Sequence, residues 1–195
     1  MSTVQRICPE DLISAYSQGY FPMADEYDGK IYWHCPDYRA VMPFHDLKQP
    51  RSLRQFLKKN HISFKVNTNF EYVIYKCADR DSTWINREII DVYINFHYLG
   101  FAHSVEAYIG NQIVGGLYGV SMGGAFFGES MFSELSNASK ASFYYLIERL
   151  KERKFILLDS QYLNPFTESL GAIEIPKYTY MHILNRALKM PCKFA

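Results

Sequence analysis

The hydrophobic pattern of this chain changes its period near Ala102, and this change limits the folds available to it. From residue 102 to 132 the apolar residues follow the period of two that is typical of strands, whereas the flanking segments follow the helical period. Gly110-Asn111 separates the first two of these strands, and a two-residue loop that begins with glycine favours a hairpin. We therefore expect a meander of three strands, at 102–109, 112–120 and about 124–132.

Helical patterns lie on both sides of this meander. Pro9-Glu10-Asp11 opens one helix and Gly19 ends it, as helix start and stop residues do. A meander followed by short strands that alternate with helices predicts an α+β fold with a mixed sheet. The expected helices are 9–18, 51–60, about 70–78, 87–98, 138–153 and one from near Tyr178, and the expected short strands are 155–158 and 172–175.

The composition excludes several classes of protein. The 195 residues, 48% of them apolar, suffice for one domain or for one domain with a small additional unit. The net charge is only +1, so a nucleic-acid ligand would need a local basic patch. The four cysteines have no zinc spacing and indicate free thiols in a reducing compartment, and we expect no bound metal. Without a signal peptide or a membrane-spanning apolar run, the expected location is cytoplasmic.

A basic segment without acidic residues lies between Leu47 and Phe70. On the expected helix Arg51, Arg54 and Lys58 share one face, and the opposite face is apolar, with Leu53, Phe56 and Leu57. Such a helix is either a solvated surface helix or a ridge that contacts nucleic-acid phosphates. The candidate phosphate-contacting residues of this helix are Arg51, Arg54, Lys58 and Lys59.

The strand Phe126-Phe127-Gly128-Glu129-Ser130-Met131-Phe132 contains one carboxylate among apolar residues. Strict alternation would place Phe127, Glu129 and Met131 on one face and Phe126, Gly128, Ser130 and Phe132 on the other. A carboxylate in this environment needs a partner. It either forms an ion pair, with Lys140 or Arg149, or receives a cationic group of a ligand beside an apolar pocket.

Asp159-Ser160-Gln161 follows the expected strand 155–158. Positions two apart in a strand point the same way, so Asp159 and Gln161 could act on one site at a strand end, where ligands commonly bind. The alternative for Asp159 is a turn or capping residue. Trp84, just before a helix, either fills the core or stacks on a base. These patterns alone leave the function open between an enzyme and an RNA-binding domain.

An ordered set of sequence blocks extends through nearly the whole chain. The blocks are GYFPMA at 19–24, WHCPDYRAV at 33–41, TWI at 83–85, AHSVEAY at 102–108, VGGLYGVSMGGAFFGESMFS at 114–133, NASK at 137–140, LLDSQ at 157–161 and SLGAIEIP at 169–176. No single block is specific, but their order and spacing together resemble one family, the leucyl/phenylalanyl-tRNA–protein transferases.

This resemblance implies an acetyltransferase-like (GNAT-type) mixed sheet flanked by helices. The implied domains are a reduced N-terminal helical and loop subdomain over 1–62, which carries the basic helix, and a catalytic domain over 63–195. The implied reaction moves Leu, Phe and, less well, Met from aminoacyl-tRNA to the N-terminal α-amine of proteins that start with Arg or Lys. This modification would mark them for N-end-rule degradation. Aminoacyl-tRNA is then a co-substrate, and no cofactor is expected.

The resemblance also implies roles for particular residues. Asp159 and Gln161 match the reacting centre, and Trp84 and Asn164 match positions near the terminal adenosine. Glu129 is expected to meet a cationic amine. The implied pocket for the aminoacyl side chain is formed by Leu117, Phe126, Met131, Leu146 and Leu158.

Two departures from the family and two rival functions accompany this prediction. Met23 and His34 stand where some relatives carry Trp, which bears on how the tRNA end is stacked. One rival is an acetyltransferase that uses acetyl-CoA, which would need a glycine-rich pyrophosphate loop; residues 134–137, before the expected helix, do not supply one. The other is an RNA-binding module that binds tRNA without turnover.

Overall fold

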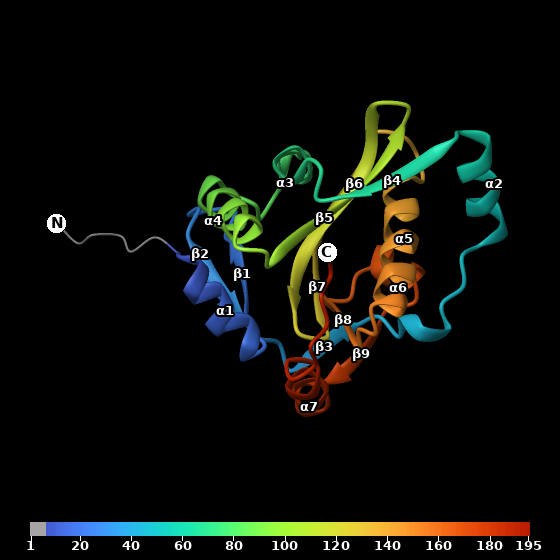
Figure 1. Cartoon of the computed structure of the whole chain (residues 1–195). Coiled ribbons are helices and arrows are strands. Elements are labelled where there is room, and N and C mark those ends of the chain that lie inside the picture. Colours follow the sequence, from blue (N-terminus) through green and yellow to red (C-terminus); the bar gives the residue numbers. More distant parts are fainter. Residues whose placement is uncertain (1–6) are drawn as a thin grey trace.

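The computed structural model describes residues 7–195 and is built around one mixed sheet (Figure 1). Neighbouring strands of this sheet run antiparallel, except β7 and β8, which run parallel to each other. The seven strands lie in the order β4 (Ile62–Val66), β5 (Ala102–Ile109), β6 (Gln112–Met122), β7 (Ala125–Ser133), β8 (Leu157–Gln161), β3 (Tyr38–Val41) and β9 (Ile173–Pro176). A separate hairpin joins β1 (Phe21–Ala24) and β2 (Ile31–His34).

Helices cover both faces of the sheet, and each face has its own apolar core (Figure 1). One core contains side chains of α1 (Pro9–Ser17), α3 (Phe70–Ala78), α4 (Arg87–Tyr98) and α7 (Lys177–Ala187). The other forms beneath α5 (Ala138–Glu152), with Leu53 of α2 (Arg51–Lys59) and Phe44 of the 3-10 turn η1 (Phe44–Asp46) at its margin. A short helix, α6 (Pro165–Ser169), follows β8. The fold is thus a seven-stranded mixed sheet flanked by helices.

The expected helices and the meander are confirmed within about two residues, but several short elements were missed. The strands β1, β2 and β3 have four residues each, and β4 has five. The first three lie in a stretch that contains several proline, glycine and aspartate residues, where the sequence pattern predicts no strand. Segments this short contain too few repeats for periodicity to identify them.

The expected strand 155–158 is shifted in the structure to 157–161. The N–H of Phe155 donates to the carbonyl of Leu150, after a left-handed Lys154 with φ of 63°, so Phe155 belongs to the turn that ends α5 and not to the strand. Asp159 and Gln161 consequently lie inside a strand and not beyond it.

A β-bulge corrects the predicted alternation along β7. Tyr118 pairs with Ser130, but Gly119 pairs with Gly128, so Glu129 is an extra residue in this strand. Beyond the extra residue, each side chain points to the opposite face of the sheet from the one that strict alternation predicts. Phe127 and Phe132 therefore belong to the core of α3 and α4, whereas Phe126 and Met131 belong to the core of α5.

The bulge depends on a close approach of the two strands. A side chain at Gly119 would place its Cβ 2.3 Å from the carbonyl oxygen of Phe127, so only glycine fits there. The pairing of β7 with β8 ends at Phe127 and Asp159, and the two strands separate beyond these residues. The bulge therefore places Glu129 at the point of separation.

The predicted boundary between residues 62 and 63 falls at the beginning of β4, and β3, on its N-terminal side, is part of the main sheet. The N-terminal part of the chain is thus joined to the sheet through β3. Within residues 7–195 we find no helix that combines the length and the apolar character needed to cross a membrane.

Candidate active site

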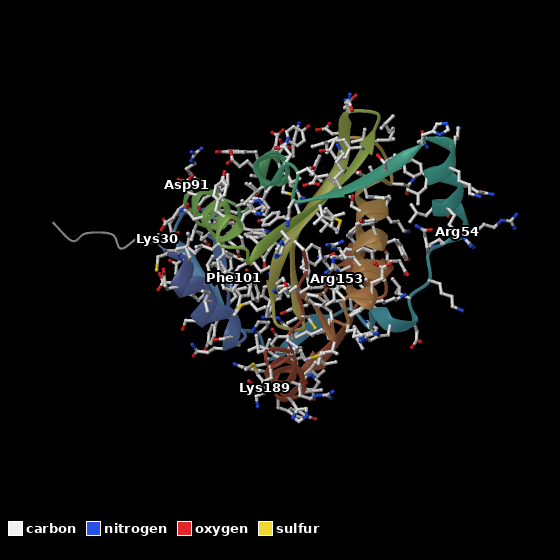
Figure 2. All side chains as sticks on the ribbon, viewed as in Figure 1. Lys30, Arg54, Asp91, Phe101, Arg153 and Lys189 are labelled. Carbon is white, nitrogen blue, oxygen red and sulfur yellow. The ribbon has the colours of Figure 1, made fainter. Side chains whose placement is uncertain are left out.

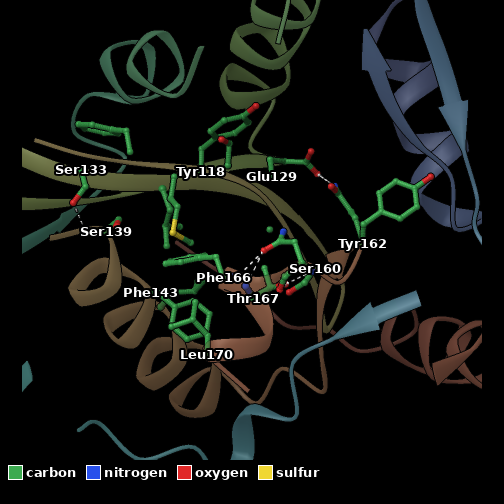
Figure 3. A pocket seen from close by; sticks show the side chains of 18 of the residues that line it. Tyr118, Glu129, Ser133, Ser139, Phe143, Ser160, Tyr162, Phe166, Thr167 and Leu170 are labelled. Carbon is green, nitrogen blue, oxygen red and sulfur yellow. Dashed lines mark hydrogen bonds between the residues drawn. The ribbon is translucent and has the colours of Figure 1, made fainter. Parts of the chain in front are cut away.

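A cavity of about 840 Å³ opens where β7 and β8 diverge (Figure 3). β6, β7, β8, α5 and α6 all contribute to its wall. Glu129 and Gln161 line this cavity, and each lies just beyond the last residues that pair β7 with β8. This volume is in the range of small-molecule sites.

One end of the cavity is apolar. Four of the five residues expected in the aminoacyl pocket line it: Leu117, Met131, Leu146 and Leu158. The fifth, Phe126, is fully buried, packs against Phe194 and is not part of the cavity wall. The structure adds side chains that were not predicted from the sequence, namely Met42, Phe143 and Leu170. They come from three separate segments that no local pattern connects.

Glu129 lies at the other end of the cavity, in an unusual environment. Its Oε1 accepts hydrogen bonds from the Tyr16 hydroxyl at 2.6 Å and the Gln161 Nε2 at 2.9 Å. Its Oε2 is buried and has no hydrogen-bond partner among residues 7–195. The ion-pair alternative with Lys140 or Arg149 is therefore wrong, and Arg149 instead donates to the Phe194 carbonyl.

This environment changes the acidity of Glu129. Burial raises the pKa of the Glu129 carboxyl from its ordinary value of 4.5 to about 7, although the hydrogen bonds from Tyr16 and Gln161 act in the opposite direction. A second hydroxyl joins this group, because the Tyr16 and Tyr93 hydroxyls are hydrogen-bonded to each other. Tyr118, whose hydroxyl is buried without a partner in the described part of the chain, also lines the cavity. Glu129 can therefore be neutral or charged near neutral pH.

Gln161 faces the cavity, whereas Asp159 lies behind it. The two side chains were expected to point the same way, but Gln161 has a left-handed backbone with φ of 63°, which interrupts the alternation. They remain in contact, since the N–H of Gln161 donates to Asp159 Oδ1 at 2.8 Å. The structure thus brings Asp159 next to Gln161 but not to the cavity surface.

Asp159 is held by a buried arginine that the sequence interpretation did not single out. Arg39 of β3 donates to both carboxylate oxygens, with its Nε 2.8 Å from Oδ1 and its Nη2 2.8 Å from Oδ2. The hydroxyl of Tyr180 donates to Oδ2 at 2.6 Å. Burial would lower the pKa of Arg39, but the carboxylate of Asp159 outweighs that effect and raises it, so the guanidinium stays charged.

Trp84 and Asn164, the residues expected near the terminal adenosine, both line the cavity. Trp84 also packs against the core of α3 and α4, so its expected role in the core is confirmed, whereas stacking on a base stays a prediction. Asn164 caps α6 by accepting from the backbone N–H of Thr167 at 2.9 Å. Trp84 and Met23 are shared with a second cavity of about 520 Å³, which His34 also lines.

The helix α2 presents its cations to solvent far from the hairpin of β1 and β2 (Figure 1). Arg51, Arg54, Lys58 and Lys59 are exposed, and Arg54 extends away from the ribbon (Figure 2). No ion pair joins any of the four to another described residue. Leu53 is buried on the opposite face, so the predicted amphipathic helix is confirmed.

Residues 7–195 contain no group of three or more His, Cys, Asp or Glu side chains placed to hold a metal ion. Besides the added residues of the apolar wall, the sequence interpretation missed the polar residues Tyr16, Tyr93 and Arg39. Tyr16 and Tyr93 have the helical spacing of core residues, and nothing local distinguishes a hydroxyl that meets a carboxylate from one that does not.

The cavity thus combines an apolar recess with the amide of Gln161 and the carboxylate of Glu129. Two family models match the chain: leucyl/phenylalanyl-tRNA protein transferase over residues 41–185, and the N-terminal domain of the same transferase over 5–37. The chain therefore belongs to the leucyl/phenylalanyl-tRNA–protein transferase family, and it is an aminoacyltransferase.

Individual relatives agree with this assignment. The chain is 46% identical over 188 residues to the transferase of Gloeobacter violaceus, covering 96% of this chain and 97% of the relative. It is 48% identical over 189 residues to that of Chlorobaculum tepidum, covering 95% and 97%. Among solved structures, L-PGS from Bacillus licheniformis covers 94% of this chain and 73% of its own at 12% identity and a TM-score of 0.49, which is too low to assign the fold further.

Proposed function

We propose that this protein transfers Leu, Phe and, less well, Met from aminoacyl-tRNA to the N-terminal α-amine of proteins that begin with Arg or Lys. The observation that carries this proposal is the apolar recess that ends at Gln161 and Glu129. From the membership of this family we also propose an acetyltransferase-like catalytic domain, a cytoplasmic location, a role in N-end-rule degradation and no cofactor besides the aminoacyl-tRNA co-substrate.

The apolar end of the cavity suits the proposed donors. Its wall combines Met131 and Met42, whose side chains adapt to different shapes, with the fixed surfaces of Leu117 and Phe143. A pocket of this kind accepts long unbranched, γ-branched and aromatic side chains. It separates them weakly, because one methylene changes the binding energy by only about 1–3 kcal/mol.

The amide of Gln161 is oriented for an incoming amine. An ionised carboxylate only accepts hydrogen bonds, so the Gln161 amide presents its NH₂ group to Glu129. Its carbonyl oxygen receives no hydrogen bond from the described residues, and Gln161 lines the cavity. This oxygen can accept an N–H of the acceptor amine and direct the nitrogen lone pair toward the ester carbon.

The chemistry needs little further assistance. The amine nitrogen forms the new amide bond while the ester C–O bond to the tRNA ribose breaks, and the released ribose oxygen takes up the proton that the attacking nitrogen loses. The donor is an ester and the product an amide, so the reaction is downhill without ATP. An α-amine with a pKa near 7.7–8.0 is partly neutral at cytoplasmic pH, so no strong base is required. Holding the amine and ester together can contribute about 7–11 kcal/mol. The developing ammonium is stabilised by the carboxylate of Glu129 and, behind Gln161, by that of Asp159.

The terminal adenosine and the remaining tRNA have separate candidate contacts. Trp84 offers an aromatic surface at the junction of the two cavities, with Asn164 on the wall of the larger one. The four exposed cations of α2, which lie outside both cavities, are suited to contact phosphates of the tRNA body without reading its sequence. These contacts complete the proposed donor site.

The proposal is tested by a transfer assay with labelled Leu-tRNA, Phe-tRNA and Met-tRNA and three matched peptides. One peptide begins with Arg, one with the same Arg acetylated, and one with Asp. We expect label only in the free Arg peptide, with Met used least. Gln161→Ala should lower transfer, whereas Gln112→Ala, at the exposed start of β6, serves as the matched control.

The outcomes separate the rival functions. Binding of tRNA without any labelled peptide would indicate a non-catalytic RNA-binding module. Acetyl-CoA binding in isothermal titration, with acetyl transfer to the same peptide, would indicate an acetyltransferase. Equal labelling of the Arg and Asp peptides would retain the transferase but refute the acceptor specificity.

A further inference from the structure

Arg39 is the most buried cation of the described chain, and the proposed chemistry does not use it directly. Its side chain is 1% exposed and lies between two aromatic rings, with its Cζ 4.4 Å from the centroid of Phe21 and 4.8 Å from that of Tyr180. Besides its three contacts to Asp159, it donates from Nη1 to the Gly19 carbonyl at 3.1 Å. The guanidinium is thereby fixed on every side.

Asp159 has no free capacity for a substrate. Its Oδ1 accepts from Arg39 Nε and the Gln161 N–H, each at 2.8 Å. Its Oδ2 accepts from Arg39 Nη2 at 2.8 Å and the Tyr180 hydroxyl at 2.6 Å. The carboxylate is fully buried and is not part of the cavity wall. Any effect of Asp159 on the reaction must therefore pass through its charge or through Gln161.

Gln161 needs an external hold on its backbone. A φ of 63° is unfavourable for a residue with a side chain, and its neighbours must stabilise this conformation. The hydrogen bond from its N–H to Asp159 does so, and the side chain then reaches Glu129 at 2.9 Å. Rotation of this backbone would move the amide away from the cavity.

A buried ion pair can also be no more than a structural contact, since desolvation offsets much of its attraction. Here, however, the contacts run without a break from Arg39 through Asp159 and Gln161 to Glu129, and they end at the cavity. Arg149 provides the contrast: it also covers an aromatic ring, that of Phe194, and donates to a carbonyl, but it has no such connection to the site.

We propose that Arg39 is a positioning residue for aminoacyl transfer, which holds Asp159 and, through it, the left-handed Gln161 in the orientation that meets the acceptor amine. This inference rests on the proposed function. It makes Asp159 part of the support of Gln161 and not a group that touches the substrate.

The test is a double-mutant cycle between Arg39→Lys and Gln161→Ala, measured as the single-turnover rate with saturating Phe-tRNA and an Arg-starting peptide. Lysine keeps the charge but lacks the fork that meets both oxygens. We expect Arg39→Lys to lower the rate about 10- to 100-fold, the size of effect that a small misplacement produces, with donor affinity unchanged. In the Gln161→Ala background the same change should alter the rate less than about twofold.

Arg149→Lys is the matched control and should leave the rate unchanged in both backgrounds. If Arg39→Lys lowers the rate equally with and without Gln161, Arg39 acts on the fold alone and the inference is refuted. If Arg39→Lys does not fold, as shown by its thermal transition, Tyr180→Phe replaces it in the cycle, because it removes one donor to Asp159 without leaving a charge unpaired. A wild-type protein that labels no peptide would refute the proposed function instead.

Discussion

Replacing Glu129 by glutamine should change how the stability of this protein depends on pH. A carboxyl pKa that rises from 4.5 to about 7 corresponds to about 3 kcal/mol between the two protonation states. The folded state holds this proton more tightly than the unfolded state, so this group lowers the free energy of unfolding as pH rises from about 4 to above 7. The glutamine in Glu129→Gln cannot ionise, so the free energy of unfolding of this variant does not decrease in this way.

We therefore expect the free energy of unfolding of Glu129→Gln, relative to wild type, to increase by about 3 kcal/mol between about pH 4 and pH 8. Urea unfolding at a series of pH values measures this difference, and titrations common to both proteins cancel in it. Glu148→Gln, on the exposed side of α5, is the surface control. A difference that stays constant across this range would show that the buried environment of Glu129 does not perturb its ionisation.

Three further changes probe other parts of the site. Arg54→Glu with Lys58→Glu should raise the Kd for aminoacyl-tRNA at low salt and flatten its salt dependence, because fewer counterions are released on binding; unchanged binding would make α2 an ordinary surface helix. Met131→Ala should shift the relative use of Leu, Phe and Met donors in a competition assay, and unchanged ratios would place the aminoacyl pocket elsewhere. Tyr16→Phe removes a hydrogen bond that lowers the pKa of Glu129, so the acid limb of the kcat/KM profile should move to higher pH. If the acid limb does not move, the ionisation of Glu129 does not determine it.

Matched variants accompany these measurements. Lys189→Glu places a new negative charge at an exposed position beyond α7, away from α2 (Figure 2), and should not change tRNA binding as the α2 pair does. Tyr108→Phe removes a buried hydroxyl that contacts Thr68 and not Glu129, and should leave the acid limb in place.

The long elements of this fold could be predicted from the sequence because their periodicity extends over many residues. The helices α3 and α4 and the strand β5 have the predicted bounds. The four-residue strand β3 is defined instead by its partners β8 and β9, which lie more than a hundred positions away. No local pattern contains that information.

The cavity could be predicted residue by residue only as far as the family resemblance extended. Periodicity placed Phe126 and Met131 on opposite faces, and the bulge at Glu129 brings them into the same core. A bulge depends on how two strands meet, here at Gly119, and alternation within one strand does not show it. The same limit explains why Tyr16, which donates to Glu129, and Tyr93, which is hydrogen-bonded to Tyr16, were missed, since both come from helices distant in sequence.

The position of β3 between β8 and β9 also determines when the site can form during synthesis. Arg39 and Asp159 are separated by 120 positions, so the arginine leaves the ribosome long before its partner exists. At about 5–20 residues per second, this interval lasts about 6–24 s. Until then β3 has neither neighbour, and its eventual pairing closes one of the longest loops in the chain, the kind of contact that forms slowly. A nascent chain that ends before β9 thus lacks one of the two strands that hold β3, and we expect aminoacyl transfer to begin only after the last strand has been added.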